Sequence, residues 1–539
     1  MDAKKRYGGI LSNLPWLSEK HLWVLVLSLA IGVRFYAIQN PYFWTDEAFS
    51  ALMSVQSPER IWFHTGHDVH PPLYFLLLHA WIAVCGDGVF SQRAMSALAG
   101  VLSTLLGMWL MRLLDTPRTA VLAGLFLALF PIAVRYSQEA RMYTLEFVWL
   151  LGATIALVYW LKNTRDRYLV AYALLMTAAL YTHYFALFCV LSHWVYLSIL
   201  ALQKNPPTRP VFRSAWWLAN ISIALLYVPW LISPIDEIFF NTEQFRIGGD
   251  IFWIPKPTAY TLPSSIWKFF SLRDRLDLFT PGNLLFPLFI CALALAGAFQ
   301  IKGHFKFGLL LSLHTFLPIF SVFLLSFIFP VFMERYVAFA ALGLPMLLAV
   351  AISRLANRTP LLALSAILLI LSVQLIGLQT LYAQQDELDD PRNEQANPID
   401  EIVAYIDERF LQGDSIVVQG GYQYLSVAYY NRKGVRPLLF EPPWDATHHN
   451  RPNGYGASTL IYADRDSVFF EDLDHLPASI KKRVWWVTAI HWEDEQRPFP
   501  NDWQCQFAKR AGDMELRLYV IHASTNARGQ PQTQHCDIQ

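Results

Sequence analysis

Two neighbouring carboxylic acids, Asp46 and Glu47, lie in the stretch FWTDEAF, shortly after an apolar run over residues 21–38. Ionisable side chains at the boundary of a membrane are costly, and proteins retain them chiefly where they serve a function. Thr45 could cap a helix that begins here and place both acids in its first turn, where the helix dipole keeps carboxylates ionised. The pair is therefore either an ordinary helix start or a site for chemistry.

Three histidines, His64, His67 and His70, follow the acids at intervals of three residues. Imidazole and carboxylate groups are common ligands of divalent metals, so His64, His67 and Glu47 form a candidate metal site. Gly66 argues against a helix that would bring the rings onto one face, and histidines in such a loop more often serve as hydrogen-bonding groups. The sequence therefore predicts no firm cofactor, and a divalent metal remains an alternative.

A second group of polar side chains lies in the stretch RYSQEARMY, residues 135–143. Gln138, Glu139 and Arg141 follow one another closely here, with Tyr143 beside them. Arginines and tyrosines at a membrane surface can act as plain anchors. That explanation covers the tyrosines and one arginine, and it covers Gln138 and Glu139 less well.

The composition identifies the class of protein that must position these side chains. Of 539 residues, 54% are hydrophobic and only 16% are charged, which is more apolar surface than a soluble domain can bury. Lysine plus arginine equals aspartate plus glutamate at 42 each, so no excess charge indicates binding to nucleic acid. The chain is therefore predicted to be an α-helical polytopic membrane protein.

Apolar runs of about 20 residues predict the membrane-spanning helices. The run over residues 71–84 is left out, because its 14 residues are too few to cross about 30 Å of hydrocarbon as a helix. It is predicted to lie along the membrane surface. About eleven spans remain, near residues 21–38, 92–113, 119–135, 142–161, 167–181, 184–202, 214–234, 283–301, 306–330, 333–353 and 360–381.

Basic residues between the spans predict the orientation of the chain. If residues 71–84 do not span, the basic turns between spans, such as those at Arg118 and Arg358, fall on the same side as Lys4. Cytoplasmic loops carry the excess of lysine and arginine, so the N-terminus is predicted to be cytoplasmic. The segments predicted to lie on the other side are 39–91, 134–143, 235–282 and the chain after about residue 383.

The last part of the chain predicts a separate extracytoplasmic α/β domain over residues 383–539, after a transmembrane domain over residues 1–382. An amphipathic helix in NPIDEIVAYIDERF is followed, after Gly413, by a short strand, and RVWWVTAI and ELRLYVIHA predict two further buried strands. Cys505 and Cys536 lie in this domain, where an oxidising compartment would allow a disulfide, and the sequence leaves their pairing open.

Several motifs resemble those of a known family of membrane enzymes. They are DE at 46–47, DVHPPL at 68–73, YSQEARMY at 136–143, YTHYF at 181–185, FWIPKP at 252–257 and ERY at 334–336. In this order they resemble the GT-C membrane glycosyltransferases, over about residues 20–380. The groups with the strongest resemblance are the protein O-mannosyltransferases, the lipid A aminoarabinose transferases and the RgtA/B/C/D-like proteins.

The resemblance implies a reaction and its partners. Such enzymes move a sugar, with inversion, from a polyprenyl-phosphate carrier to an acceptor hydroxyl of a glycan, lipid or protein at the external membrane face. In agreement, no glycine-rich phosphate loop follows a strand in the membrane region. The expected location is a bacterial inner membrane, with the C-terminal domain in the periplasm.

The resemblance also implies roles for individual residues. Asp46 is expected to be the general base that takes the proton of the acceptor hydroxyl, with Glu47 as its support or as the alternative base. A leaving polyprenyl phosphate needs cationic or hydrogen-bonding partners, and those expected here are Arg141, Arg335 and His70. The residues expected to position the acceptor are Glu139, Gln138, Tyr143 and His183.

Two other classes of protein remain as alternatives. A transporter or flippase of a lipid-linked or polar substrate would also place charged residues between helices, but it should contain repeats or spans broken by glycine or proline. The sequence shows neither of these features. A non-enzymatic membrane scaffold for the C-terminal domain would have no need of the Asp46–Glu47 pair.

Overall fold

The computed structural model describes most of the chain. The described residues are 18–203, 213–246, 254–274, 281–301, 303–388, 398–443, 451–473, 476–477, 480, 482–490, 499–500 and 502–522, of which 234–246 and 281–283 are described by their backbone alone.

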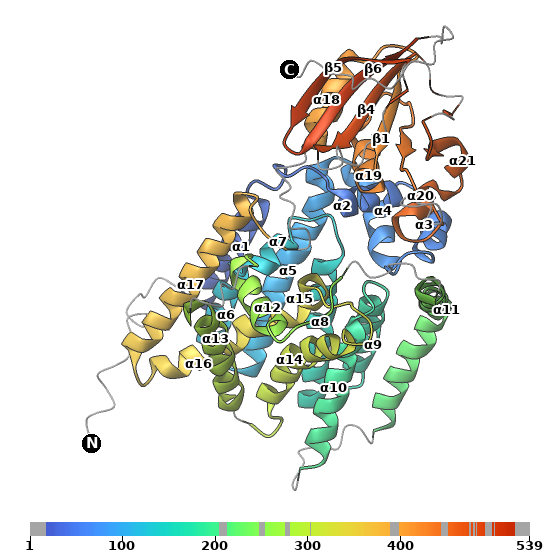
Figure 1. Cartoon of the computed structure of the whole chain (residues 1–539). Coiled ribbons are helices and arrows are strands. Elements are labelled where there is room, and N and C mark those ends of the chain that lie inside the picture. Colours follow the sequence, from blue (N-terminus) through green and yellow to red (C-terminus); the bar gives the residue numbers. More distant parts are fainter. Residues whose placement is uncertain are drawn as a thin grey trace, which may run out of the picture. The chain divides into compact units, whose positions relative to one another are not determined.

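The chain folds into two compact units (Figure 1). Unit 1 comprises Met1–Tyr36, Ser96–Val228 and Phe252–Tyr382, and unit 2 comprises Ala37–Met95, Pro229–Ile251 and Ala383–Gln539. The whole of the first external segment, 39–91, therefore folds with the C-terminal part of the chain. The sequence analysis had grouped this segment with residues 1–382.

Unit 1 is helical. Its elements, two of which extend into unit 2, are α1 (Glu19–Phe35), α5 (Val89–Leu114), α6 (Pro117–Ala128), α7 (Pro131–Arg135), α8 (Tyr143–Asn163), α9 (Arg167–Leu180), α10 (Ala186–Ala201), α11 (Ser214–Arg246), α12 (Thr261–Ser271), α13 (Pro281–Gln300), α14 (Phe307–Leu325), α15 (Glu334–Ala341), α16 (Gly343–Ala356) and α17 (Pro360–Tyr382).

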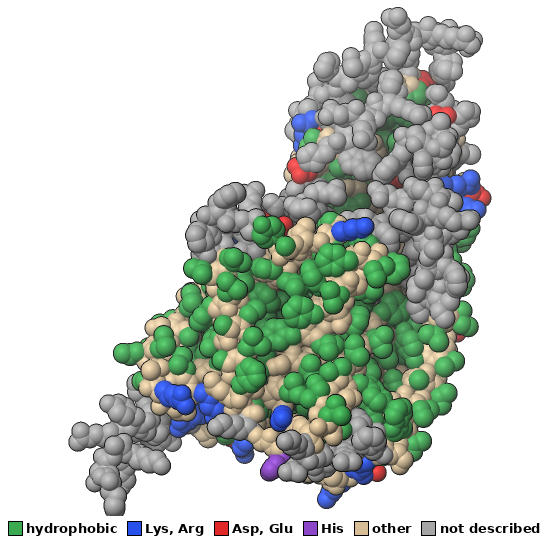
Figure 2. Space-filling view, turned by 60° about the horizontal axis from the view of Figure 1, so that its bottom comes forward, with side chains coloured by type: hydrophobic (Ala, Val, Ile, Leu, Met, Phe, Trp, Pro, Cys, Tyr) green, Lys and Arg blue, Asp and Glu red, His purple; other side chains and the backbone are tan. Residues whose placement is uncertain are grey.

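The described part of the chain contains six helices that are long and apolar enough to cross a membrane, or seven if the bent pair α6–α7 is one span. Several of the other predicted spans, among them α9, α10 and α13, form shorter apolar helices, so the count of eleven is not confirmed. Large hydrophobic side chains remain exposed along these helices, for example Leu361 and Leu368 on α17. Figure 2 shows a broad hydrophobic belt with a group of lysine and arginine side chains at its lower edge.

The predicted span over residues 119–135 forms two helices, α6 and α7, with a bend of 58° at the break between them. Pro131 opens α7 and has no N–H to continue the hydrogen-bonding ladder of α6. The carbonyls freed in the last turn of α6 accept hydrogen bonds from Gln374, at 3.0 Å, and from the buried guanidinium of Arg34, at 3.0 and 3.3 Å. A broken apolar helix is tolerated where other side chains satisfy its backbone. This break directs the chain into the turn that carries residues 138–142.

Unit 2 combines short helices from the first external segment with an α/β domain. The elements are α2 (Thr45–Ser54), α3 (Pro58–Thr65), α4 (Leu73–Cys85), α18 (Ile399–Arg409), β1 (Ser415–Gln419), α19 (Gly421–Tyr430), β2 (Leu438–Phe440), η4 (Gly456–Ser458), α20 (Thr459–Tyr462), α21 (Arg465–Val468), β3 (Phe469–Phe470), β4 (Arg483–Ala489), β5 (Trp503–Ala511) and β6 (Met514–Ile521). The run 71–84, predicted to be too short to span, forms α4 and packs against α2 and α3.

The α/β domain contains a six-stranded mixed sheet with the order β3-β2-β1-β4-β6-β5. Strands β1 to β4 pair in parallel, and β6 pairs antiparallel with β4 and β5. The predicted helix after residue 398 and the strands around 415, 483 and 515 are confirmed as α18, β1, β4 and β6. Gly413 has φ +96°, as a turn between α18 and β1 requires. Cys505 is disulfide-bonded, and Cys536 lies outside the described residues.

Candidate active site

Asp46 and Glu47 lie in the first turn of α2, as predicted. The predicted cap is wrong: the helix begins at Thr45, its N-cap is Trp44, and no side chain caps it. The hydroxyl of Thr45 instead donates a hydrogen bond to the backbone carbonyl of Tyr422 in α19. The start of α2 is therefore fixed by the C-terminal α/β domain of the same unit.

Glu47 is held in a buried ion pair with Arg93. The Nε and Nη2 atoms of Arg93 donate to the two carboxylate oxygens of Glu47 at 2.7 and 2.5 Å, in the bidentate geometry that suits these groups. Arg93 also donates to the carbonyls of Ile38, Pro41 and Tyr42 at 2.8 to 3.0 Å. One guanidinium thus fixes both Glu47 and the chain that leads into α2.

Arg93 escaped the sequence analysis because it lies 46 residues from Glu47, at the edge of an apolar run. The position of Arg93 could have indicated its importance, because an arginine at the start of a membrane span needs a partner. Asp46 differs from Glu47 in its surroundings. Between Tyr42 and Ser50 it is the one residue that is not buried.

Helix α19 makes two further contacts with the entry to α2. The N–H of Phe43 donates to the hydroxyl of Tyr430 at 2.7 Å, and the Phe43 ring stacks on Tyr429 with centroids 4.9 Å apart. The guanidinium of Arg93 lies 5.0 Å from the centroid of the Phe43 ring. Phe43, three positions before Asp46, is therefore held by α19 on one side and by Arg93 on the other.

Replacing Tyr430 with Phe is expected to lower the rate of the sugar transfer that the sequence resemblance implies, by about fivefold to tenfold, because a net hydrogen bond of about 1 kcal/mol that positions the first turn of α2 is lost. The measurement is steady-state transfer by purified protein. Tyr405→Phe is the matched control, because Tyr405 lies in α18 of the same domain and its ring contact with Phe507 survives the change. Equal rates for the two variants would contradict a positioning role for Tyr430.

The histidines of the first segment have separate partners. His70 Nδ1 lies 3.0 Å from Asp68 Oδ2, and both side chains are buried. His64 Nδ1 lies 3.0 Å from the hydroxyl of Thr459. Burial, with Arg60 and His67 close by, lowers the pKa of His64, so its imidazole is neutral at pH 7.

The candidate metal site of His64, His67 and Glu47 gains no support from these contacts. His67 Nδ1 lies 2.9 Å from the carbonyl oxygen of Phe63, and both oxygens of Glu47 accept from Arg93. Among the described residues, the one group of three side chains spaced to share an ion is Cys189, His193 and His314.

In unit 1, the turn after α7 brings together the predicted residues of the second polar group. Gln138 closes the end of α1, because its amide donates to the carbonyl of Tyr36 at 2.7 Å and to that of Arg34 at 3.1 Å. Glu139 forms a buried ion pair with Arg135 at 3.3 Å. The backbone of Arg141 accepts a hydrogen bond from Ser96 on α5 at 3.1 Å, and its guanidinium is buried.

His183 lies among side chains from three helices. Its ring centroid is 6.1 Å from that of Tyr143 on α8 and 5.3 Å from that of Tyr336 on α15. Glu146, one turn into α8, has a carboxylate oxygen 3.8 Å from His183 Nδ1. Both oxygens of Glu146 are buried without a hydrogen-bond partner among the described residues. The sequence analysis missed this acid, whose signal was its place inside an apolar run.

The predicted phosphate ligand Arg335 is buried at the start of α15, between two residues with defined contacts. Glu334 accepts a hydrogen bond from the hydroxyl of Ser265 at 2.9 Å and forms an ion pair with Lys268 at 3.3 Å. Ser265 and Lys268 both lie on α12. The Arg335 guanidinium lies 5.4 Å from the centroid of the neighbouring Tyr336 ring. Helix α12 and the contact of α15 with α8 thus fix this short segment.

Lys268 is a further cation of this region that the sequence analysis did not single out. Its ammonium lies 2.7 Å from Asp274 and 3.3 Å from Glu334. Burial alone would lower the pKa of Lys268, but the two carboxylates outweigh it and raise the pKa above its usual value. Lys268 therefore stays charged.

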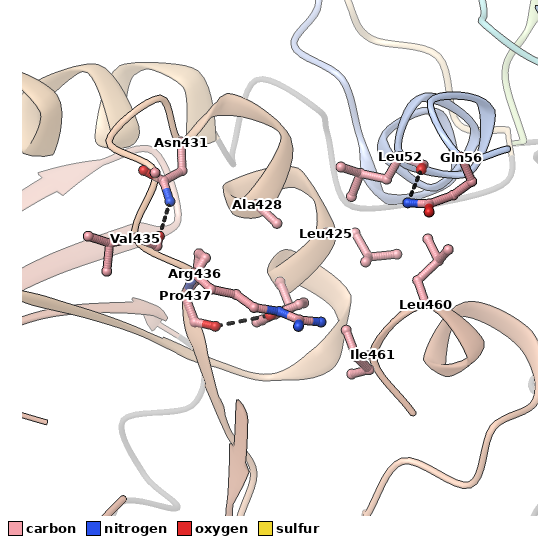
Figure 3. Close-up of a pocket in the computed structure, with 12 residues that line it drawn as sticks. Leu52, Gln56, Leu425, Ala428, Asn431, Val435, Arg436, Pro437, Leu460 and Ile461 are labelled. Atoms are coloured by element: carbon pink, nitrogen blue, oxygen red, sulfur yellow. Dashed lines mark hydrogen bonds between the residues drawn. The ribbon is translucent and has the colours of Figure 1, made fainter. Parts of the chain in front are cut away.

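Unit 2 also contains a pocket of about 330 Å³ at the C-terminal end of α2 (Figure 3). Leu52 and Gln56 face Leu425 and Leu460 across it. Arg436 lines the same pocket and is paired with Asp464. None of the residues predicted to act in catalysis lines this pocket, so the chemistry is not assigned to it.

Comparisons with known proteins agree with the predicted class. Residues 69–232 match the sequence model of the family described as dolichyl-phosphate-mannose-protein mannosyltransferase. No curated protein sequence matches the chain.

Solved structures match nearly the whole chain. ArnT from Cupriavidus metallidurans in the apo state gives a TM-score of 0.62 at 14% identity, over 93% of this chain and 98% of ArnT. The same protein bound to undecaprenyl phosphate gives 0.59 at 15% identity, over 92% and 97%. The oligosaccharyltransferase AglB from Archaeoglobus fulgidus, in complex with an inhibitory peptide and a dolichol-phosphate, gives 0.53 at 13% identity, over 88% and 70%.

These matches confirm the predicted resemblance to GT-C membrane glycosyltransferases, at the level of the family and the fold. The matched family and these structural neighbours are glycosyltransferases, which agrees with the prediction of an enzyme.

Proposed function

We propose that the protein transfers a sugar from a polyprenyl-phosphate-linked donor to an acceptor hydroxyl at the external face of a membrane, with inversion and with Asp46 as the general base. The observation that carries this proposal is the difference between the two acids. Both oxygens of Glu47 are engaged by Arg93 in a buried pair, whereas Asp46 is the accessible residue of a rigidly held first turn.

The two acids would then have different roles. Glu47 orients the turn through Arg93, and Asp46 takes a proton. A hydroxyl is a poor nucleophile at neutral pH, so a positioned carboxylate that accepts its proton lowers the barrier to attack. The dipole of α2 favours the ionised form of an acid in its first turn, as this role requires.

The proposed reaction is a single displacement at the anomeric carbon. The acceptor oxygen forms a bond to C1 of the sugar while the bond from C1 to the phosphate oxygen breaks. The hydroxyl proton passes to Asp46 and then to water, and the carrier leaves as polyprenyl phosphate. Because attack and departure occur on opposite faces of C1, the configuration inverts.

The leaving phosphate needs positive charge, and we assign Arg141 and Arg335 to it, with His70 as a further hydrogen-bonding group. Both arginines are buried, and each is held by its backbone in a segment with defined contacts. The undecaprenyl phosphate and dolichol-phosphate bound to the matched structures are ligands of the kind that this assignment needs. We assign Glu139, Tyr143 and His183 to positioning the acceptor, whereas the contacts of Gln138 favour a structural role.

The proposed location is a bacterial inner membrane, with a cytoplasmic N-terminus and a periplasmic C-terminal domain. The distribution of basic residues between the spans supports this orientation of the two termini. A donor carried by a polyprenyl chain would reach the enzyme from within the bilayer.

The test is a transfer assay with purified protein in liposomes. Radiolabelled polyprenyl-phosphate sugars, hexoses and pentoses in turn, are supplied with lipid, glycan or peptide acceptors, and labelled product and released polyprenyl phosphate are measured. Transfer from at least one lipid-linked donor is expected, and nucleotide sugars should be inert. Transfer from a nucleotide sugar in the absence of any lipid carrier would overturn the proposed donor class.

A further inference from the structure

A buried cluster of one cysteine and two histidines lies inside unit 1, and none of these three residues has a role in the proposed reaction. Cys189 and His193 are four residues apart on α10 and so share one face of that helix, and His314 comes from α14. Cys189 Sγ lies 3.3 Å from His314 Nδ1 and 3.8 Å from His193 Nε2. None of the three side chains is more than 1% exposed.

The spacing of the three donor atoms fits a shared metal ion. Metal–sulfur bonds of about 2.3 Å and metal–nitrogen bonds of about 2.0 to 2.1 Å, at angles of about 100 to 120°, separate sulfur from nitrogen by about 3.3 to 3.8 Å. The two measured separations lie at the ends of this range. All three donor atoms lie within 4.8 Å of one another.

The surroundings of His193 resemble those of a metal ligand. Its other ring nitrogen, Nδ1, lies 3.2 Å from the hydroxyl of Tyr172 on α9. A histidine that binds a metal usually has its second nitrogen hydrogen-bonded to a neighbouring group, which fixes the ring and its tautomer. The Thr154 hydroxyl on α8 lies 3.3 Å from Nε2 and donates to Leu150 O at 2.8 Å. Four helices thus define the position of this ring.

We propose that Cys189, His193 and His314 bind one soft metal ion, Cu(I) or Zn(II). Thiolate and imidazole are suitable ligands for both ions. On binding, the Cys189 thiol loses its proton to solvent and the thiolate forms a bond to the metal, while the two imidazoles bind as neutral ligands.

Charge balance distinguishes the two ions. One thiolate and two neutral imidazoles carry a charge of −1, so a monovalent ion gives a neutral site, whereas a divalent ion leaves a net charge of +1 that a nearby carboxylate must offset. Glu146 on α8 lies close enough to Cys189 to interact with it electrostatically, so it is the acid that would offset a divalent ion.

Such an ion would cross-link α10 and α14, which contribute to the same helical unit. The site has no part in the proposed proton transfer. Its loss should therefore change metal content and thermal stability more than it changes the chemistry of transfer.

The full-length protein is purified in detergent without metal, treated with a chelator, and reloaded with Cu(I) or Zn(II). Metal per chain is then measured by mass spectrometry after gel filtration, and X-ray absorption reports the ligands. One ion per chain with one sulfur and two nitrogen ligands is expected for the wild type. Cys189→Ser and His314→Gln should each reduce metal content at least tenfold.

Cys291→Ser is the matched control, because Cys291 is a free, partly buried thiol on the neighbouring helix α13. This variant should bind metal as the wild type does. A second measurement uses the wild type alone, so it does not depend on whether a variant folds. During unfolding in detergent, bound metal should slow alkylation of Cys189 without slowing that of Cys291.

Two results decide the proposal. Equal metal content in the wild type and Cys189→Ser, or no metal above the chelated background in either, would overturn it. One ion per chain, Cu(I) or Zn(II), held by one sulfur and two nitrogen ligands and lost in Cys189→Ser, would support it.

Discussion

Replacing Asp46 with Asn is expected to reduce the rate of sugar transfer by about 10²- to 10⁴-fold, the usual contribution of a positioned general base. The amide has nearly the shape of the carboxylate but cannot accept a proton, so binding of the donor should change little. The measurement is the turnover rate of purified protein with a lipid-linked donor, together with donor affinity and the thermal unfolding temperature.

Glu59→Gln is the matched control for Asp46→Asn. Glu59 is an acid in the first turn of α3, in the same segment of the chain, and its side chain is exposed. Its variant should transfer sugar at close to the wild-type rate. Full activity of Asp46→Asn would refute the assignment of the base, whereas equal loss in both variants would point to a general effect of charge on the segment.

Replacing Arg93 with Met is expected to destabilise the protein by about 3 to 5 kcal/mol, because it leaves the carboxylate of Glu47 buried without its partner. It also removes the donor to three backbone carbonyls before α2. Sugar transfer should fall as well, since the first turn of α2 loses its anchor. Thermal or denaturant unfolding in detergent, followed by tryptophan fluorescence, measures the change.

Arg112 offers the control on the same helix. It pairs with Glu19 at 2.8 Å, but both side chains are well exposed, and exposed pairs contribute at most about 1 kcal/mol. Arg112→Met should therefore unfold at nearly the wild-type temperature. The double variant Glu47→Leu with Arg93→Met should recover part of the stability lost in Arg93→Met, because no charge is then left buried. If the stability lost in the double variant equals the sum of the losses in the two single variants, the ion pair itself is not the source of the instability.

Local patterns predicted the parts of the molecule that depend on neighbours in sequence. The acids in the first turn of α2, the short helix α4, and the strands β1, β4 and β6 all follow from periodicity and length over a few residues. No broken span was predicted, although Pro131 lies inside the run over residues 119–135, because whether a proline breaks a membrane helix depends on groups that satisfy the freed carbonyls. Those groups, Arg34 and Gln374, lie far away in the sequence.

The features that the sequence did not predict depend on pairs of residues far apart in the chain. Arg93 with Glu47 and Cys189 with His314 are 46 and 125 residues apart, and no local pattern indicates such partners. The cap assigned to Thr45 failed for a related reason, because the carbonyl of Tyr422 attracts its hydroxyl. The count of about eleven spans is not confirmed, because the predicted spans over residues 167–181 and 184–202 form helices of 14 and 16 residues, which are shorter than the usual crossing length.

The dependence of α2 on α19 has a consequence for biosynthesis. Phe43 emerges from the ribosome 387 residues before Tyr430, which is a delay of about 20 to 80 s at ordinary rates of synthesis. During that interval the first segment lacks the contacts that fix the turn carrying Asp46. An unfinished chain, or one whose last domain has not been translocated, should therefore hold its donor-binding helices in the membrane without a working base. Release of free sugar from the lipid carrier by immature enzyme would be prevented by the order in which the chain is made.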